Sequence, residues 1–271
     1  MKPATILASL VLAACGCRAV SSDASRPPDP TDGCASPTLT PGVTKGSIDV
    51  GGVTRTYVLS VPAQERDRPV PVVFAFHGMG SNGNDFRNWL AWLKLEDSAA
   101  GPTIFVYPDG LADGSGSTGW PDTGGRDVAL FDALLARIEA GACVDAGRVF
   151  VMGFSYGGFM SNTLGCRRAG VVRAIAPLSG FAPGGACNGQ TVAVWMATGT
   201  DDSLLPSSRN ARDLFAGIDR CTAATAPVAP APCVAYQGCA GDAPVVWCEF
   251  AGVHEVQDWE PPALMAFFDA L

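Results

Sequence analysis

Short apolar runs alternate along the chain with longer segments in which apolar residues recur every three to four positions. Short runs bounded by turn residues are typical of strands that are buried on both faces of a sheet. Such runs occupy 70–76, 103–107, 148–152, 171–176, 192–197 and 245–250. The clearest helix is 127–139, because its apolar side chains fall on one stripe.

A hairpin precedes this alternation. Residues 47–53 and 55–61 alternate apolar and polar positions on either side of Gly51-Gly52, which is typical of two strands joined by a tight turn. A hairpin followed by alternating strands and helices predicts an α/β fold, with a mainly parallel sheet that carries helices on both faces. The Ala- and Pro-rich stretch 222–232 predicts an exposed excursion late in this fold.

The amino terminus differs from the rest of the chain. Lys2 precedes an apolar run of nine residues at 6–14. Crossing a bilayer takes roughly 17–25 residues, so this run predicts a signal peptide over 1–14 rather than a membrane anchor.

The end of that run bears on localisation. Leu12-Ala13-Ala14-Cys15 resembles the bacterial lipoprotein processing motif, which implies cleavage before Cys15 and acylation of that residue. An ordinary secretory peptide cleaved nearby is the alternative. Residues 15–33 are rich in Ser, Pro and Asp and predict a flexible, lipid-anchored linker. Residues 34–271 then form one folded domain at the cell surface or outside the cell.

Composition and charge exclude several classes of protein. The 271 residues are 48% hydrophobic, which is enough for one domain with a substantial core. A net charge of −8 argues against a nucleic-acid partner, which needs a basic face. With only three lysines the chain lacks a polybasic membrane patch, so we expect membrane contact only through the lipid on Cys15. Ten cysteines favour an oxidising compartment with several disulfides.

The strongest chemical motif follows the run at 148–152. Gly153-Phe154-Ser155-Tyr156-Gly157 is a Gly-x-Ser-x-Gly sequence between a predicted strand and a predicted helix. In this setting the serine occupies a tight strand-to-helix turn and its hydroxyl projects at the carboxyl edge of the sheet. The motif therefore predicts Ser155 as a nucleophile, although the same sequence also occurs in plain turns.

A nucleophilic serine needs a base, and the chain contains two histidines. His77, in His77-Gly78-Met79-Gly80, resembles the His-Gly oxyanion loop of α/β hydrolases, where the histidine has a structural role. His254 follows the last strand and is the base by elimination. A surface histidine at this position would leave the serine without a partner.

The third residue should come from a loop after a late strand, where a carboxylate can orient the imidazole. Asp201 and Asp202 follow the run at 192–197, and on position alone either could serve. The chain order Ser155, Asp202, His254 is that of α/β hydrolases. The cysteines and histidines have no metal-ligand spacing, so we expect no metal and no cofactor.

Taken together, the motifs resemble the feruloyl esterase and polyhydroxybutyrate depolymerase-like branch of the carbohydrate esterases, which have the α/β-hydrolase fold. The resemblance extends over 33–254 and rests on the serine and histidine motifs above together with Tyr107-Pro108-Asp109-Gly110, Gly119-Trp120-Pro121, Gly124-Gly125-Arg126-Asp127, Cys143-Val144-Asp145, Gly199-Thr200-Asp201-Asp202, Tyr236-Gln237-Gly238-Cys239 and Trp247-Cys248-Glu249-Phe250. The chain departs from the family at Val253, where Gly is usual, and just after the histidine, where Trp-Pro or Val-Pro is common.

The resemblance implies a two-step acyl transfer. Asp202 would be the acid, and the backbone amides of Met79 and Tyr156 would form the oxyanion hole. The expected activity is that of a secreted serine esterase, most of all a feruloyl esterase acting on plant cell-wall polysaccharide esters. The alternatives are a short-chain polyhydroxyalkanoate depolymerase, an acetylxylan esterase, a peptidase and, from another class, an inactive surface-binding module. We expect a monomer.

Aromatic residues near the predicted loops are candidates for substrate binding. Tyr156, Trp120 and Trp259 are the candidates for stacking on a phenolic acid or a sugar ring, with core packing as the alternative for each. Phe86, Trp89 and Trp92 are spaced three apart on a predicted helix, which indicates packing.

Eight cysteines remain when Cys15 and Cys17 are set aside. Cys143 precedes the strand of the serine motif and Cys166 ends the following helix, so strand and helix rise place both at the same edge of the sheet. We therefore predict Cys143–Cys166, with Cys34–Cys187 tying down the amino terminus. The pairing of the other four, Cys221, Cys233, Cys239 and Cys248, stays open.

Overall fold

The computed structural model describes residues 31–63, 68–112 and 114–271. The predicted signal peptide, the acylation site at Cys15 and most of the predicted linker lie outside the described residues. Within those residues, no helix combines the length and the apolar character that crossing a bilayer requires.

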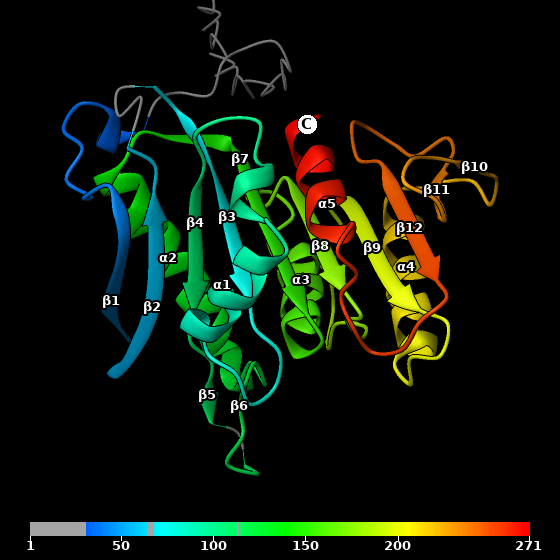
Figure 1. Cartoon of the computed structure of the whole chain (residues 1–271), viewed down its shortest axis with the longest axis horizontal. Coiled ribbons are helices and arrows are strands. Elements are labelled where there is room, and N and C mark those ends of the chain that lie inside the picture. Colours follow the sequence, from blue (N-terminus) through cyan, green and yellow to red (C-terminus); the bar gives the residue numbers. More distant parts are fainter. Residues whose placement is uncertain (1–30, 64–67, 113) are drawn as a thin grey trace, which may run out of the picture.

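One large sheet organises the described chain (Figure 1). Its strands, in spatial order, are β1 (Gly42–Val50), β2 (Val53–Val61), β4 (Ile104–Pro108), β3 (Val70–Phe76), β7 (Val144–Phe154), β8 (Ala174–Leu178), β9 (Ala193–Gly199), β12 (Val245–Phe250), β11 (Cys233–Tyr236) and β10 (Thr225–Pro227). From β4 to β12 the neighbouring strands are parallel. The opening hairpin β1–β2 extends one edge antiparallel to β4, and β11 and β10 extend the other. The predicted α/β fold is confirmed, while β10 lies inside the stretch 222–232 that was expected only as an excursion, and β11 directly follows that stretch.

Helices cover both faces of the sheet. The helices are α1 (Gly83–Trp92), α2 (Arg126–Gly141), α3 (Tyr156–Arg167), α4 (Leu205–Ile218) and α5 (Glu260–Asp269), with 3₁₀ helices η1 (Asp32–Cys34), η2 (Glu96–Ser98) and η3 (Thr123–Gly125) and a separate small ribbon β5 (Leu111–Ala112) with β6 (Thr118–Gly119). Figure 1 shows α1 and α5 on the near face and α2, α3 and α4 behind.

The two faces bury separate hydrophobic cores. Successive residues of a strand point to opposite faces, and β3 follows this rule, because Phe74 packs in the core under α2 and α3 while Val73 packs in the core under α1 and α5. All seven residues of β3 are buried. This sandwiching explains why the central strands are continuous apolar runs in the sequence, since neither face meets water.

Four disulfides join the eight described cysteines, and both specific pairings predicted above are wrong. Cys34 pairs with Cys143, and Cys166 pairs with Cys187. The remaining four form Cys221–Cys239 and Cys233–Cys248. Four disulfides fit a protein that folds in an oxidising compartment.

Local backbone hydrogen bonds explain the corrected pairing. Thr38 and Leu39 both donate from their backbone amides to the Gly141 carbonyl, which lays the amino-terminal segment along the end of α2 and beside Cys143. The Asn188 amide donates to the Cys166 carbonyl and brings the loop after β8 against the end of α3. Strand and helix rise place Cys143 and Cys166 at one edge of the sheet, but they do not determine which elements are neighbours along that edge.

Candidate active site

The carboxyl ends of the parallel strands all lie at one edge of the sheet, the lower edge in Figure 1. In open α/β sheets this is the edge where ligands bind. Loops leaving β3, β7, β9 and β12 at this edge carry the residues that the sequence singled out.

Ser155 lies in a strained turn between β7 and α3. Its φ of 58° and ψ of −115° fall outside the regions that non-glycine residues favour. Backbone hydrogen bonds hold it there, because its amide donates to Leu178 and its carbonyl accepts from Phe159, at 2.9 and 3.0 Å. Strain that the surrounding structure enforces in this way is typical of functional positions.

The glycines of the motif permit this turn by close backbone approach. A Cβ atom on Gly157 would overlap the Phe76 carbonyl at the end of β3, and one on Gly153 would overlap the Gly157 carbonyl. A Cβ on Gly158 would lie 2.6 Å from the Gly180 Cα. The elbow is therefore wedged between β3 and the end of β8, which fixes the place of Ser155.

Asp202 and His254 are brought together although 52 residues separate them. His254 Nδ1 lies 2.8 Å from Asp202 Oδ2, while the Leu204 amide donates to Asp202 Oδ1 at 2.8 Å. Asp202 is buried, whereas Asp201 is exposed and is anchored through its own amide to the Gly252 carbonyl. The alternative left open by the sequence is thus resolved geometrically in favour of Asp202 as the neighbour of the imidazole.

The surroundings of Asp202 favour its charged form. Burial alone would raise the pKa of this carboxyl, but the bond from the Leu204 amide and the contacts with His254 and Ser179 outweigh it, so its pKa is lowered. An ionised Asp202 accepts from Nδ1–H, which leaves Nε2 as the ring nitrogen able to accept a proton.

His77 is held in a different role. It is fully buried, its Nε2 accepts from the Gly110 amide at 2.9 Å, and its Nδ1 lies 2.7 Å from the Gly78 carbonyl. These partners require a neutral ring with the proton on Nδ1. Burial lowers the pKa of His77, against the opposing effects of the Gly78 carbonyl and Asp109. Both ring nitrogens are engaged in holding the loop, as expected for a structural histidine.

The loop after His77 passes next to Ser155. A Cβ on Gly78 would lie 3.6 Å from the Ser155 Cβ. The Gly80 amide donates to the Thr118 carbonyl of β6, and the Thr118 hydroxyl donates to the Ser81 carbonyl. This loop places Met79 beside the elbow, while Tyr156 begins α3, where backbone amides point out of the helix.

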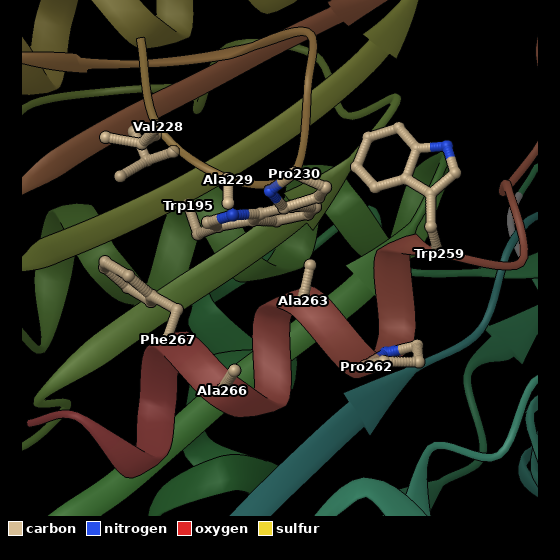
Figure 2. A pocket seen from close by; sticks show the side chains of 10 residues that line it. Trp195, Val228, Ala229, Pro230, Trp259, Pro262, Ala263, Ala266 and Phe267 are labelled. Carbon is tan, nitrogen blue, oxygen red and sulfur yellow. The ribbon is translucent and has the colours of Figure 1, made fainter. Parts of the chain in front are cut away.

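The two tryptophans expected at the substrate site lie elsewhere. Trp120 has no exposed surface and donates from Nε1 to the His77 carbonyl at 2.8 Å, so it supports the loop from behind and cannot stack on a ligand. Trp259 lines a separate apolar pocket of about 730 Å³ between α5 and the 228–230 segment (Figure 2). That pocket is lined by none of Ser155, Asp202 and His254.

Other aromatic side chains lie next to the elbow. Phe154, which precedes Ser155, lies 4.8 Å from the His254 ring and 5.5 Å from Trp89, measured between ring centroids. Tyr156, which follows Ser155 and was also a stacking candidate, contacts Phe181 at 5.7 Å. The three-residue spacing on α1 had indicated packing, which holds for Phe86, but Trp89 is 38% exposed.

Trp92 departs further from that expectation, because 87% of its surface is exposed. The spacing alone places the three aromatic residues on one helix, but in the structure they differ in how far they are buried. No signal in the sequence distinguishes these three side chains, since their exposure depends on how α1 meets the sheet.

A buried carboxyl ends the His254 loop and makes stability depend on pH. Glu260, the first residue of α5, has no exposed surface. Burial raises its pKa to about 8. Between about pH 4.5 and pH 8 the folded chain therefore keeps a proton that the unfolded chain releases, so the free energy of unfolding falls as the pH rises.

The substitution Glu260→Gln tests this dependence. We expect the variant to lose less stability than the wild type between pH 5 and pH 8.5, because one proton-linked contribution of up to about 1.4 kcal/mol per pH unit is removed. Urea unfolding at both pH values measures it, with Asp242→Asn, at an exposed position, as control. Burial raises the pKa of Asp219 to about 7, so the free energy of unfolding still depends on pH in every variant. If this dependence were the same in wild type and Glu260→Gln, Glu260 would not be the group that causes it.

Among the described residues, no cluster of three or more His, Cys, Asp or Glu side chains is arranged to hold a metal ion. The groups at this edge that can take part in acyl transfer are the serine elbow, the Asp202–His254 pair and the backbone amides around them.

Comparison with known proteins places this arrangement in a family. No protein-family model matches the chain. Feruloyl esterase D of Neurospora crassa is 34% identical over 253 residues, which cover 86% of this chain and 84% of that protein. Feruloyl esterase C of Emericella nidulans is 37% identical over 180 residues, covering 64% of this chain and 63% of that protein, so the match spans less than two thirds of this second relative.

Solved structures agree in fold. The acetylxylan esterase from Aspergillus awamori superposes with a TM-score of 0.61 at 18% identity, covering 83% of this chain and 98% of that one. At this identity the likeness establishes the α/β-hydrolase fold alone. The similarity to the Neurospora protein extends over most of both sequences, and the chain therefore belongs to the feruloyl esterase family of carboxylic ester hydrolases.

Proposed function

We propose that this chain is a secreted serine esterase that hydrolyses esters joining hydroxycinnamic acids, ferulic acid above all, to plant cell-wall sugars. The observation that carries the proposal is the Asp202–His254 pair at the same edge of the sheet as the strained Ser155, in a chain that is 34% identical to a feruloyl esterase over 253 residues.

The first half of the reaction forms an acyl-enzyme. The Ser155 Oγ attacks the ester carbonyl carbon while His254 Nε2 takes the hydroxyl proton, and Asp202 holds the ring in the required tautomer. The tetrahedral intermediate collapses when the bond to the sugar oxygen breaks, and His254 gives its proton to that oxygen. The sugar alcohol leaves, and the acid remains bound to Ser155 as an ester.

The second half releases the acid. Water attacks the acyl carbon as His254 takes its proton, and the Ser155 oxygen leaves and recovers a proton from His254. In both halves the negative charge develops on the former carbonyl oxygen, where the amides of Met79 and Tyr156 would donate. Such a donor typically contributes about 3–4 kcal/mol to transition-state stabilisation.

The surroundings of the elbow suit a planar acyl group. Trp89, 38% exposed, packs against Phe154, and Met79, 61% exposed, follows Gly78, which approaches Ser155. Tyr156, which follows Ser155 in the chain, forms an aromatic cluster with Phe159 and Phe181, and the last two rings are stacked at 4.6 Å. A phenolic ring bound between such surfaces gains about 25 cal/mol for each Å² of apolar area buried.

Acetylxylan esterase activity is the second candidate. A bifunctional acetylxylan esterase/xylanase from Neocallimastix patriciarum is 29% identical over 136 residues, half of this chain but 20% of that protein. An acetyl group needs little of the apolar surface around Ser155, so the aromatic residues there favour the larger acid.

A panel of esters separates these candidates. We expect kcat/KM for methyl ferulate to exceed that for a hydroxybutyrate oligomer by at least about tenfold, which corresponds to 1.4 kcal/mol of transition-state binding. Acetylated xylan should be a poorer substrate than feruloylated arabinoxylan. Turnover of the oligomer with methyl ferulate untouched would replace this proposal by a polyhydroxyalkanoate depolymerase.

Cell-surface attachment is part of the proposal. Cys15 would carry the lipid, residues 15–33 would form the linker, and residues 34–271 would act as a monomeric catalytic domain. Lipidated chains should partition into the detergent phase of a Triton X-114 extract of the producing bacterium, and Cys15→Ser should move the activity to the aqueous phase, because two or more acyl chains give stable membrane anchoring. Equal partitioning of both forms would indicate an ordinary secretory signal.

A further inference from the structure

The base of the proposed triad sits on an exposed loop. His254 lies in the segment 251–259 between β12 and α5, and its side chain is 36% exposed. Val253 and Glu255 on either side of it are also exposed. The hydrogen bond to Asp202 holds one edge of the ring, but a single bond at one edge leaves the ring able to tilt about the Nδ1–Oδ2 direction. That tilt would move Nε2, the atom that must face Ser155.

One aromatic side chain packs against the imidazole. The Phe154 ring lies 4.8 Å from the His254 ring between centroids, and the two planes are tilted by 31°. This separation is within the range of interacting aromatic pairs. Phe154 is the last residue of β7 and directly precedes Ser155, so the sheet sets its position together with that of the serine.

Phe154 is itself packed on another side. The ring of Trp89 of α1 lies 5.5 Å from the Phe154 ring between centroids, and Trp89 in turn contacts the buried Phe86 at 5.7 Å. The Phe154 side chain therefore contacts both α1 and the imidazole.

From these contacts we infer that Phe154 is a positioning residue for the proposed base. Asp202 fixes the edge of the His254 ring and Phe154 fixes its plane, so that Nε2 stays directed at Ser155. The inference rests on the triad proposed above. The same contact favours the transition state, because His254 becomes a cation when it takes the serine proton and an aromatic face attracts a cation.

Kinetics of Phe154 variants test this role. We expect Phe154→Leu to lower kcat by about 10- to 100-fold, since misplacement of a catalytic group by about 1 Å has an effect of that size. KM should change less than twofold, and the factor should be the same for 4-nitrophenyl acetate and methyl ferulate. Phe154→Trp, which keeps a flat face, should recover most of kcat, whereas Phe154→Met, of similar bulk without one, should not. Trp92→Leu, an exposed aromatic residue on α1, is the matched control and should equal the wild type.

Imidazole NMR supplies a readout that does not depend on turnover. The chain has two histidines, so ¹⁵N-histidine labelling gives two imidazole spin systems. Phe154→Leu should shift and broaden the His254 signals and leave those of His77, which is fully buried and held at both nitrogens, unchanged. A wild-type protein inactive on every ester would refute the proposed function, while the spectra would still test the contact.

Two results would overturn the inference. The first is a loss confined to methyl ferulate and expressed as a higher KM, which would make Phe154 a wall of the acyl site. The second is unchanged kcat together with unchanged His254 signals in folded Phe154→Leu and Phe154→Met. Melting temperatures of all variants, compared with the wild type, establish that each is folded under the conditions of the assay.

Discussion

Replacing Ser155 by Ala is expected to lower kcat/KM for every ester substrate by about three to six orders of magnitude. The substitution removes only the hydroxyl group. Backbone hydrogen bonds to Leu178 and Phe159 hold the turn, and alanine can form both of them. The variant should therefore unfold at nearly the wild-type temperature. Covalent labelling by a fluorophosphonate, read as a mass increase of the intact protein, should disappear with the activity.

His254→Ala should have an effect of similar size, because members of one catalytic unit do not contribute additively. The matched control is His77→Gln. His77 bridges the Gly110 amide and the Gly78 carbonyl in a fully buried site, so its replacement should reduce the free energy of unfolding more than His254→Ala does. The assignment of the base would be wrong if the His77→Gln variant were fully folded but inactive on esters while the His254→Ala variant remained active.

The sequence predicted those parts of the site that depend on local order along the chain. A strand, a Gly-x-Ser-x-Gly motif and a helix in succession are enough to predict a serine at the carboxyl edge of the sheet, and the structure has Ser155 between β7 and α3 at that edge. Asp202 and His254 could be predicted as candidates because each follows a late parallel strand, and parallel strands end at the same edge. The choice between Asp201 and Asp202 required the observed hydrogen bond.

Which segments lie next to one another along an edge of the sheet could not be predicted in the same way. Strand and helix rise place Cys143 and Cys166 at one edge of the sheet. Each pairs instead with a cysteine from another segment, Cys34 of η1 or Cys187 of the loop after β8, whose path depends on hydrogen bonds to the ends of α2 and α3. The prediction that Trp120 binds substrate was wrong for a related reason. Trp120 follows a short ribbon that turns it under the His77 loop, and burial of a single side chain cannot be deduced from its neighbours in sequence.

The contacts of Phe154 could not be predicted from the sequence either. Phe154 occupies a variable position of the serine motif, and its partners Trp89 and His254 lie 65 residues before it and 100 residues after it. The motif fixes where its backbone runs, while α1 and the His254 loop decide what its ring meets. Residues of this kind are visible only once the three segments are placed together.

Asp202→Asn is expected to lower kcat by about 10⁴-fold, the size of effect that the same change has in the well-studied serine protease triad. Asp202 Oδ2 accepts the Nδ1 proton of His254, and Oδ1 accepts from the Leu204 amide. An asparagine amide in this place would turn its oxygen to the Leu204 amide, because a carboxamide nitrogen cannot accept. Its NH₂ group would then face Nδ1 and hold the ring proton on Nε2, where His254 can no longer take the proton of Ser155.

Asp201→Asn is the control that the chain itself provides. Asp201 is adjacent in sequence and carries the same charge, but its side chain is exposed and only its backbone amide is bound, to the Gly252 carbonyl. The change should alter kcat less than about threefold, since a surface charge outside the site is screened by solvent. Both variants should be compared at pH 8, well above the lowered pKa of Asp202, so that the wild-type carboxylate is fully ionised. If Asp201→Asn were the more damaging of the two, the hydrogen bond between Asp202 and His254 would not be the one that sets the tautomer of the base.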